Sequence, residues 1–423
     1  MLIVERTGVL ARPLSDRVVI FRIRLAIAVI PDRHLTLIVI LSEAKDLLVP
    51  SISTSQRFAF VILPPALEWG NLLVQCAIVF DKLQFLLLAD MTQLYPLLMS
   101  PAFDPRPWGT LDLSPIYPNQ KFTEKIGEAW LTGEDCHVTN GPLAKRTLSD
   151  LSKEFGPALV GTAARDPQRF PLLLKFLFPE EKLSVQVHPD DATAQRFGEP
   201  WGKTECWYVA HARPGAQIGL GLKPGVTAAQ LEQAIHEKRA EELLNWINVY
   251  QGEMIYVAGG TVHTLGPGSV IVETQQQSDT TYRLYDYGRP RPLHLERGLA
   301  SVKERNASGK VIRPTPISID GGKNRQSAMI AAPYFAVDLY ELKDPHHFST
   351  GDPTGRDSVQ ILVAVDGCGV IEVPRHNPVT LAKGDAVVVP AVLRDFTVRP
   401  QWQLEFLKAS VPGTILSEPA TRI

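Results

Sequence analysis

The sequence has few cysteines and no close pair of them. Four occur in 423 residues, at Cys76, Cys136, Cys206 and Cys368, and none forms a CxxC motif. A scattered set of this kind argues against a disulfide framework and against a zinc site built from thiolates. It is typical of a protein kept in a reducing compartment, and we expect a cytoplasmic location.

Long uncharged apolar runs are also missing. The run FAFVILPPAL at 58–67 is broken by prolines, and NLLVQCAIVF at 71–80 stops at Asp81. A membrane-spanning helix needs about 20 apolar residues. The N-terminus carries Glu5 and Arg6 and lacks the order of charged, apolar and cleavage segments found in a signal peptide. We therefore expect no membrane association.

A large excess of one charge is absent as well. The formal net charge is −2, so the overall balance does not favour nucleic acid or an anionic membrane as a partner. A small anionic substrate would need a local cluster of lysine and arginine. With 45% apolar residues, the chain is long enough for two domains with sizeable cores, but its oligomeric state stays open.

Glycine is scarce in one part of the chain. Residues 1–90 contain only Gly8 and Gly70, and the other 28 of the 30 glycines follow. This stretch is rich in Leu, Ile and Val without a sustained period, although VVIFRIRLAIAVI could be a strand. It is either an N-terminal extension that binds a partner, or the product of a start assigned too far upstream. We favour the second interpretation, with Met91 as the true start.

Residues 91–423 have the pattern of short strands joined by Gly/Pro turns, which is typical of β-sandwiches and barrels. The segment 171–187 has the pattern of a β-hairpin. An amphipathic helical segment is expected at 227–247, with Thr227 as its N-cap, and a short helix at 293–303.

A weak internal repeat suggests two related barrels. GEMIYVAGGTVH at 252–263 and GDAVVVPAVLRD at 384–395 both begin with Gly and an acid and run through a strand into a turn. The first copy ends in His263 and the second in Asp395. We therefore expect a mainly β fold, with a metal-binding domain over 91–312 and a metal-free β domain over 313–423.

The chemistry begins at LSVQVHPDD, residues 183–191. The strand-like alternation places Ser184, Gln186 and His188 on one face and apolar residues on the other. Glu205 follows in WGKTECWYV, and His263 ends a third strand-like run. Two imidazoles, a carboxylate and an amide oxygen suit Zn²⁺, or failing that Mn²⁺ or Fe²⁺. With so few protein ligands, coordination positions on the metal stay open for water or substrate, as in a catalytic site.

Each of these residues also has a simpler interpretation. A histidine on a strand is usually exposed or hydrogen-bonded in the core, and Glu205 beside Lys203 could be a solvated pair. Asp190 and Asp191 follow a proline, and we interpret them as turn formers.

Four ordered motifs resemble one family. PLLLKFLFPEEKLSVQVHPDD, GKTECWYV, GTVHTLG and QQQSDTTYRLYDYGR, with RPWG at 106–109 and IGEAW at 126–130, resemble type I mannose-6-phosphate isomerases of the short bacterial form. The resemblance runs from about Leu94 to the end. It implies two cupin-type jelly-roll barrels and a zinc enzyme that interconverts mannose 6-phosphate and fructose 6-phosphate. Ala258 stands where the family usually has proline, which affects a turn and not a ligand.

The resemblance also implies roles for single residues. One zinc ion would be held by Gln186, His188, Glu205 and His263. Proton transfer through a cis-enediol would use the cation Arg283 and the acid–base candidates Lys203, Glu273 and Asp279, among which the sequence does not choose. The phosphate would be bound by Ser184 and Lys175, with Arg289 and Arg291 as possible helpers.

Other functions stay open at this point. A cupin isomerase of another sugar or phosphosugar would share these ligands. A sugar-binding sensor without catalysis on the same fold is the alternative from a different class, and the presence of both Lys203 and Arg283 argues against it.

Overall fold

The computed structural model describes residues 94–423 apart from 134, 135, 306, 352–354 and 415, together with the backbone of three strands nearer the N-terminus. The chain divides into two compact units, Met1–Gln93 and Leu94–Ile423. The predicted start at Met91 lies outside the described residues.

The first unit contains one antiparallel sheet. Its strands lie in the order β1 (Glu5–Leu14), β2 (Arg17–Ile30) and β3 (His34–Glu43). Val and Ile are abundant in β2, and these residues favour strands. The strand suggested by VVIFRIRLAIAVI is therefore confirmed.

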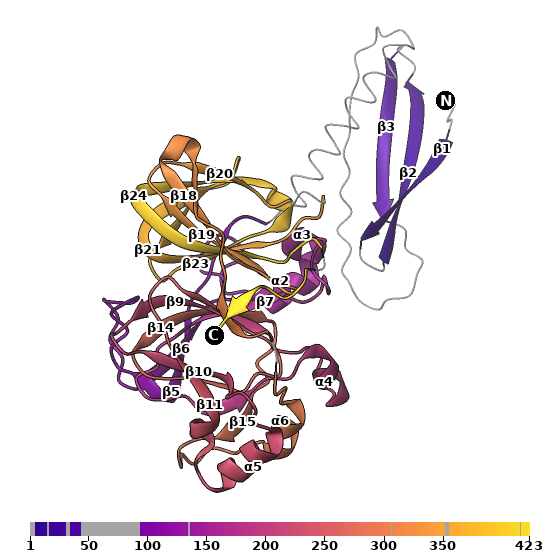
Figure 1. The fold of residues 1–423 in the computed structure, drawn as a ribbon. Helices are drawn as coiled ribbons and strands as arrows, with labels where there is room; N and C mark the ends of the chain where they lie inside the picture. The colour runs from indigo at the N-terminus through magenta and orange to yellow at the C-terminus, as the bar shows by residue number, and fades with distance from the viewer. Residues whose placement is uncertain are drawn as a thin grey trace. The chain divides into compact units, whose positions relative to one another are not determined.

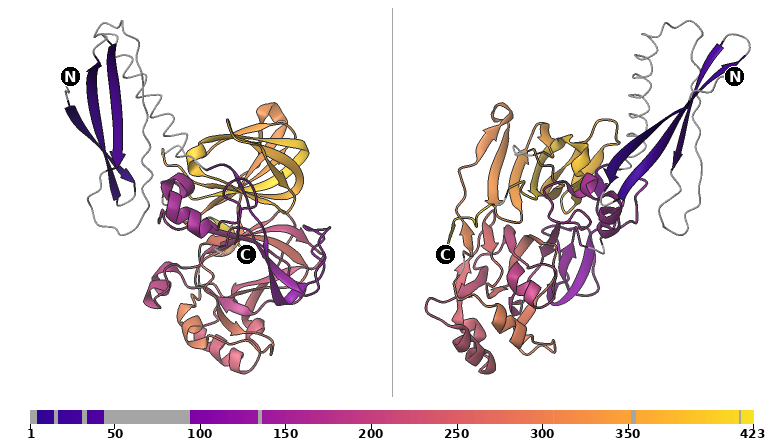
Figure 2. Two further views of the ribbon diagram at one scale, coloured as in Figure 1. Left: turned by 180° about the vertical axis from the view of Figure 1, so that it is seen from behind. Right: turned by 90° about the vertical axis from the view of Figure 1, so that its right-hand side faces the viewer.

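The second unit contains three antiparallel sheets (Figures 1 and 2). An eight-stranded sheet has the order β25 (Thr421–Arg422), β16 (Gly309–Val311), β12 (Met254–Val257), β9 (Glu205–Ala212), β14 (Ser269–Gln276), β7 (Leu172–Leu177), β6 (Ile126–Trp130) and β5 (Ala102–Thr110). A five-stranded sheet has the order β11 (Leu244–Asn248), β10 (Gln217–Leu222), β13 (His263–Leu265), β8 (Val185–Val187) and β15 (Tyr282–Tyr285).

The third sheet has nine strands. Its main path is β17 (Ile317–Ile319), β18 (Asn324–Ala331), β19 (Ala336–Leu342), β24 (Asp395–Ser410), β21 (Gln360–Glu372), β23 (Ala386–Val389) and β4 (Leu97–Leu98), with β20 (His346–Ser349) beside β24 and β22 (Val379–Ala382) beside β21. We call residues 94–312 the first half of this unit and residues 313–423 the second half.

The helices are short. They are α2 (Leu148–Phe155), α3 (Pro157–Val160), α4 (Asp191–Arg196), α5 (Ala228–His236) and α6 (Leu295–Ser301), with 3₁₀ turns η1 (Ala240–Leu243), η2 (Asp320–Gly322) and η3 (Ala391–Leu393). Within the described part of the chain, no helix has the length and apolar character needed to cross a membrane. The mainly β class is confirmed.

The predicted helix at 227–247 is only partly correct. Thr227 is the N-cap of α5 and forms a capping box with Gln230. The helix nevertheless ends at His236, and Lys238 then adopts a φ of 60°, which helical residues do not. Leu244 fits the apolar spacing of the predicted helix but lies in strand β11, where it is fully buried. The apolar pattern beyond His236 therefore does not come from a helix.

The predicted hairpin at 171–187 is wrong. Strand β7 lies in the eight-stranded sheet, whereas β8 lies in the five-stranded sheet, so the segment between them crosses from one sheet to the other. Every residue of β7 is buried, as expected of a strand covered on both faces. This crossing places the two strands on opposite walls of the same interior.

The two halves exchange their terminal strands. Strand β4, from the first half, pairs with β23 through Leu98 and Val387, and β25, from the C-terminus, pairs with β16 through Arg422 and Lys310. The largest apolar cluster also contains buried residues of both halves. The predicted boundary at 312–313 stays a prediction.

Candidate metal and catalytic site

The candidate site lies between the two sheets of the first half. On the five-stranded sheet, Gln186 of β8 is the register partner of both His263 of β13 and Arg283 of β15. Glu205 begins β9 on the eight-stranded sheet. Val185 and Val187 are fully buried on the other face of β8, in a small apolar cluster. This packing fixes the polar row that the alternation in LSVQVHPDD predicted.

Three of the four predicted metal ligands converge. One ligand atom from each of His188, Glu205 and His263 lies within 4.8 Å of the others, and all three residues are buried. Glu205 Oε2 is 3.5 Å from His188 Nε2, and Glu205 Oε1 is 3.5 Å from His263 Nε2. The geometry therefore brings together residues separated by up to 75 positions, the span from 188 to 263.

The backbone orients both imidazoles toward this point. His188 Nδ1 lies 2.9 Å from the carbonyl oxygen of Thr280, and His263 Nδ1 lies 2.9 Å from that of Thr261. A carbonyl only accepts, so each Nδ1 carries the proton and each Nε2 presents its lone pair toward the Glu205 carboxylate. Burial lowers the pKa of His263 to about 4, and burial with the Lys203 charge holds the pKa of His188 well below its usual range.

Gln186 lies beside this group. Its Nε2 is 3.2 Å from His263 Nε2, while its Oε1 accepts a 3.1 Å hydrogen bond from the buried Ser184 hydroxyl. Coordination through the amide oxygen requires the amide to turn over and break the Ser184 bond. Its predicted role as a fourth ligand stays a prediction.

Lys203 lies closest to the three ligand candidates. Its ammonium donates to Glu205 Oε2 at 2.7 Å and to His188 Nε2 at 3.0 Å. The side chain is only 3% exposed, so these bonds are made out of contact with water. The pair of Lys203 and Glu205 is therefore buried and in direct contact, and it is not the solvated pair of the simpler interpretation.

A second row of polar residues crosses the eight-stranded sheet. Glu273 of β14 is the register partner of Trp207 on one side and of Lys175 on the other, and Lys175 pairs in turn with Trp130. Trp207 Nε1 donates to Glu273 Oε1 at 3.0 Å, and Glu273 Oε2 lies 3.4 Å from Lys175 Nζ and 4.0 Å from Lys203 Nζ. Burial and the Glu205 charge raise the pKa of Glu273.

Lys175 is surrounded by acids. Besides Glu273, its Nζ lies 3.4 Å from Glu128 Oε2 and 3.3 Å from Asp279 Oδ1. It also lies 4.6 Å from the ring centre of Trp130, in cation–π geometry. Burial would lower the pKa of Lys175, but the three carboxylates outweigh it and raise that pKa. Asp279 differs from the other acids because its side chain is half exposed.

Glu128 and Arg106 belong to this row but did not enter the predicted site. Arg106 Nε donates to Glu128 Oε1 at 3.1 Å, and Trp130 Nε1 donates to Oε2 at 2.8 Å. Burial would raise the pKa of Glu128, but Lys175 and Arg106 hold it at about 2. The available signal was the lone acid inside the apolar strand IGEAW, which needs partners when buried.

Arg283 is a partly buried cation with an unusual environment. Its Nη1 donates to the carbonyl oxygen of Pro292 at 2.9 Å, and its Nε is buried with no hydrogen-bond partner among the described residues. Burial and the charge of Arg291 lower the pKa of Arg283. By contrast, Arg289 and Arg291 both pair with Asp286, at 3.2 and 2.7 Å.

Comparison with known proteins identifies the family. The model of the phosphomannose isomerase type I catalytic domain matches residues 110–204. A mannose-6-phosphate isomerase of Streptococcus mutans is 32% identical over 312 residues, which cover 71% of this chain and 94% of the relative.

Solved structures share the fold. The mannose 6-phosphate isomerase of Bacillus subtilis is 29% identical, with a TM-score of 0.66 over 75% of this chain and 99% of that one. A zinc-bound mannose 6-phosphate isomerase has 16% identity and a TM-score of 0.59 over 74% and 98% of the two chains. The predicted cupin fold and the predicted family are both confirmed. The chain belongs to the type I mannose-6-phosphate isomerases.

Proposed function

We propose that this chain interconverts mannose 6-phosphate and fructose 6-phosphate with one zinc ion at His188, Glu205 and His263. The observation that carries the proposal is a buried set of metal ligands with two cations beside it. Lys203 donates to His188 and Glu205, and Arg283 on β15 is the register partner of Gln186 on β8. Family membership supplies the substrate pair.

The residues fit a zinc ion. Glu205 Oε1 is buried without a hydrogen-bond partner among the described residues, and an orphaned carboxylate oxygen of this kind is costly unless a cation completes it. Both Nε2 lone pairs are oriented by backbone carbonyls. Two imidazoles and a carboxylate form a typical catalytic zinc set, with positions left for Gln186 and for substrate.

The reaction moves a proton between C1 and C2 of the open-chain sugar. Bound zinc supplies Lewis-acid polarisation of the carbonyl and of the adjacent hydroxyl oxygen. Arg283 adds a cation for the charge that develops on the enediolate oxygens. Its guanidinium suits this role because, within the described part of the chain, it donates to the neutral Pro292 carbonyl and forms no ion pair with a carboxylate.

Glu273 is the strongest of the three proton-transfer candidates. A general base works best with a pKa near the operating pH, and burial raises the pKa of Glu273 from its ordinary value. Trp207 donates a hydrogen bond to Glu273 Oε1, and Glu273 Oε2 points toward Lys175 and Lys203. Lys203 itself pairs with Glu205 at 2.7 Å, and Asp279 is half exposed.

Phosphate binding is proposed for Ser184 and Lys175. The Ser184 hydroxyl lies next to Gln186 and can exchange that bond for a phosphate oxygen. The Lys175 ammonium lies among three carboxylates. It would therefore contribute chiefly by neutralising part of their negative charge, which would otherwise repel the substrate phosphate.

The test is a substrate panel followed by NMR in D₂O. We expect conversion of mannose 6-phosphate into fructose 6-phosphate, with solvent deuterium entering at the transferred position. Free mannose and glucose 6-phosphate should react at least about 100-fold more slowly. Free mannose lacks the phosphate, and glucose 6-phosphate, the C2 epimer, presents its C2 hydrogen and hydroxyl in the opposite configuration. Absence of turnover with mannose 6-phosphate, or a clear preference for another sugar, contradicts the proposal.

A further inference from the structure

The turn that follows His188 touches the two segments that lead to Lys203 and to His263. The Pro189 carbonyl accepts from Lys203 N at 2.9 Å, and the His188 carbonyl accepts from Gly260 N at 2.7 Å. A Cβ atom on Gly202 would lie 2.6 Å from Asp191 N, and one on Gly259 would lie 2.7 Å from the Asp190 Cα. The backbones that lead to Lys203 and His263 are therefore packed directly against this turn.

Asp190 has a local role. It is the N-cap of α4 and accepts from Thr193 N at 2.8 Å, and it pairs with Lys303 at 2.7 Å. The cap of α4 is thus complete without Asp191, so the carboxylate of Asp191 is available for other contacts.

The Asp191 carboxylate accepts four hydrogen bonds. Oδ1 accepts hydrogen bonds from Gly202 N at 2.9 Å and from Gln276 Nε2 at 3.0 Å. Oδ2 accepts hydrogen bonds from Arg165 Nη1 at 2.8 Å and from the Tyr334 hydroxyl at 3.1 Å. These donors hold the pKa of Asp191 below its usual range although burial alone would raise it. A carboxylate that accepts this many bonds stays ionised and fixed in place.

Gln276 extends the contact to the other side of Lys203. Its Oε1 accepts from Thr204 N at 2.9 Å, and its own N–H donates to the Thr204 carbonyl at 3.2 Å. The residues before and after Lys203 are therefore both held, one by Asp191 and the other by Gln276. Their bonds determine where the Lys203 ammonium and the Glu205 carboxylate lie.

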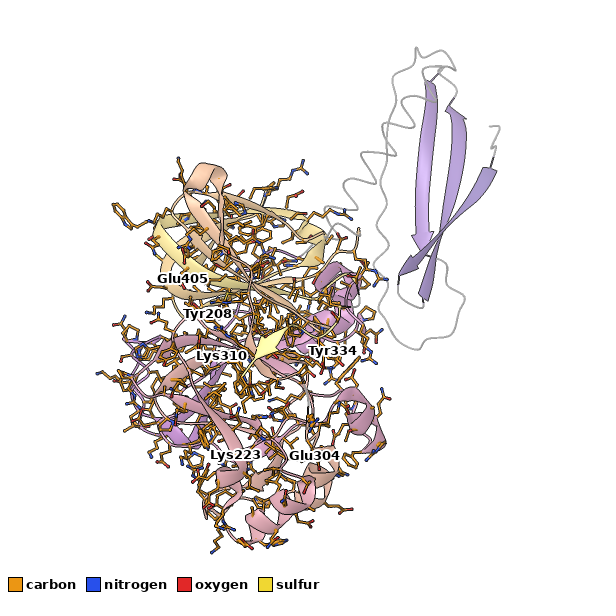
Figure 3. The ribbon with its side chains drawn as sticks, in the orientation of Figure 1. Tyr208, Lys223, Glu304, Lys310, Tyr334 and Glu405 are labelled. Atoms are coloured by element: carbon orange, nitrogen blue, oxygen red, sulfur yellow. The ribbon has the colours of Figure 1, made fainter. Side chains whose placement is uncertain are left out.

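The second half of the unit contributes one of the four donors. Tyr334 lies between β18 and β19, and burial and the Asp191 charge raise its pKa, so its hydroxyl stays protonated and donates. Figure 3 labels Tyr334 together with Tyr208 and Glu405, which join the halves at another point of the same junction. Tyr334 is thus a link between the half without metal ligands and the site.

We propose that Asp191 is a positioning residue for the Lys203–Glu205 segment, and that the second half takes part in catalysis by holding Asp191 through the Tyr334 hydroxyl. The inference rests on the proposed isomerase function. Asp191 touches neither the substrate nor the metal, and acts only through the segment that it fixes.

The experiment compares Asp191→Asn, Asp191→Ala and Tyr334→Phe with the full-length wild type. For the Asp191 variants we expect kcat to fall about 10- to 100-fold, as for other outer-shell partners, with KM for mannose 6-phosphate nearly unchanged. Zinc affinity, measured by chelator competition, should fall in the same range. Tyr334→Phe should lower kcat by about 3- to 10-fold, the equivalent of one hydrogen bond.

Tyr208→Phe is the matched control. It removes a 3.1 Å hydroxyl–carboxylate bond, to Glu405, across the same two halves without touching Asp191. It should lower the melting temperature as much as Tyr334→Phe and leave kcat and zinc affinity unchanged. Equal kcat in Tyr334→Phe and Tyr208→Phe, or wild-type kcat and zinc affinity in Asp191→Asn, overturns the inference. An inactive wild type contradicts the proposed function instead.

Discussion

The buried ammonium of Lys175 should govern how the stability of the protein depends on pH. Lys175 is 3% exposed and lies 3.3 to 3.4 Å from Glu128, Glu273 and Asp279. Lys175→Met keeps most of the side-chain volume and removes the charge. The buried carboxylates of Glu128 and Glu273 and the half-exposed one of Asp279 then repel one another with no ammonium between them.

The magnitude follows from Glu128. Its pKa falls from 4.5 to about 2 in the folded protein, with Lys175 as the larger of the two cationic causes. A fall of this size corresponds to about 3 kcal/mol of folding stability at pH values above the pKa of Glu128 in the unfolded chain. Breaking a buried ion pair on one side typically costs about 3–5 kcal/mol. We expect a loss in this range near neutral pH, measured by urea unfolding followed by tryptophan fluorescence.

The sign of the pH effect distinguishes this explanation from a packing defect. In the wild type, the Glu128 contribution is present above the unfolded pKa and is lost as the pH falls toward 2. In Lys175→Met, the folded carboxylates have raised pKa values and take up protons first, so the two proteins should become more similar as the pH falls toward about 5.

Two variants control the measurement. Adding Glu128→Gln to Lys175→Met should recover part of the lost stability, because it removes one uncompensated charge. Lys182→Met breaks a 2.6 Å pair with Glu241 that is partly exposed, and should cost no more than about 1 kcal/mol. A stability difference that is the same at both pH values, or a double variant no more stable than the single one, refutes the reasoning.

Four further results are expected. Glu205→Gln should lower the affinity for zinc about 10- to 100-fold, which metal analysis after dialysis measures as a loss of bound zinc. Full zinc retention contradicts the role of Glu205 as a ligand. Arg283→Gln should lower kcat about 100- to 1,000-fold in steady-state assays, and a change confined to KM contradicts its role in the transition state. Ser184→Ala should raise KM about 3- to 10-fold with kcat retained, whereas an unchanged KM removes it from phosphate binding. Gly202→Ala should cost about 1–3 kcal/mol in urea unfolding, because its Cβ would lie 2.6 Å from Asp191 N, and wild-type stability would mean that the turn can move.

The sequence predicted the strand that carries the ligands because β8 has one apolar and one polar face. Alternation places Gln186 and His188 together, and the structure brings them to His263 and Glu205 from two other strands. Strand β7 has no such contrast, because all six of its residues are buried. With both faces covered, its sequence gives no information about which sheet it joins, and the predicted hairpin was wrong.

The acids and donors around Lys175 could not be predicted in the same way. Glu128 is a single acid in an apolar strand, and it enters the row only through the register of β6 with β7. Asp191 was interpreted as a turn former, yet its carboxylate bonds Tyr334, 143 residues further along the chain. Contacts of this range depend on sheet order, which local patterns do not contain.

The proposed isomerisation depends on a single zinc ion at His188, Glu205 and His263. The most direct test is a coupled mannose 6-phosphate isomerase assay on the same sample before chelation, after chelation, and after stepwise return of zinc. Activity should disappear with the metal and return in proportion to added zinc, reaching its full value at about one ion per chain. Full activity in the metal-free protein, or in a His263→Ala variant that binds no zinc, would contradict the account.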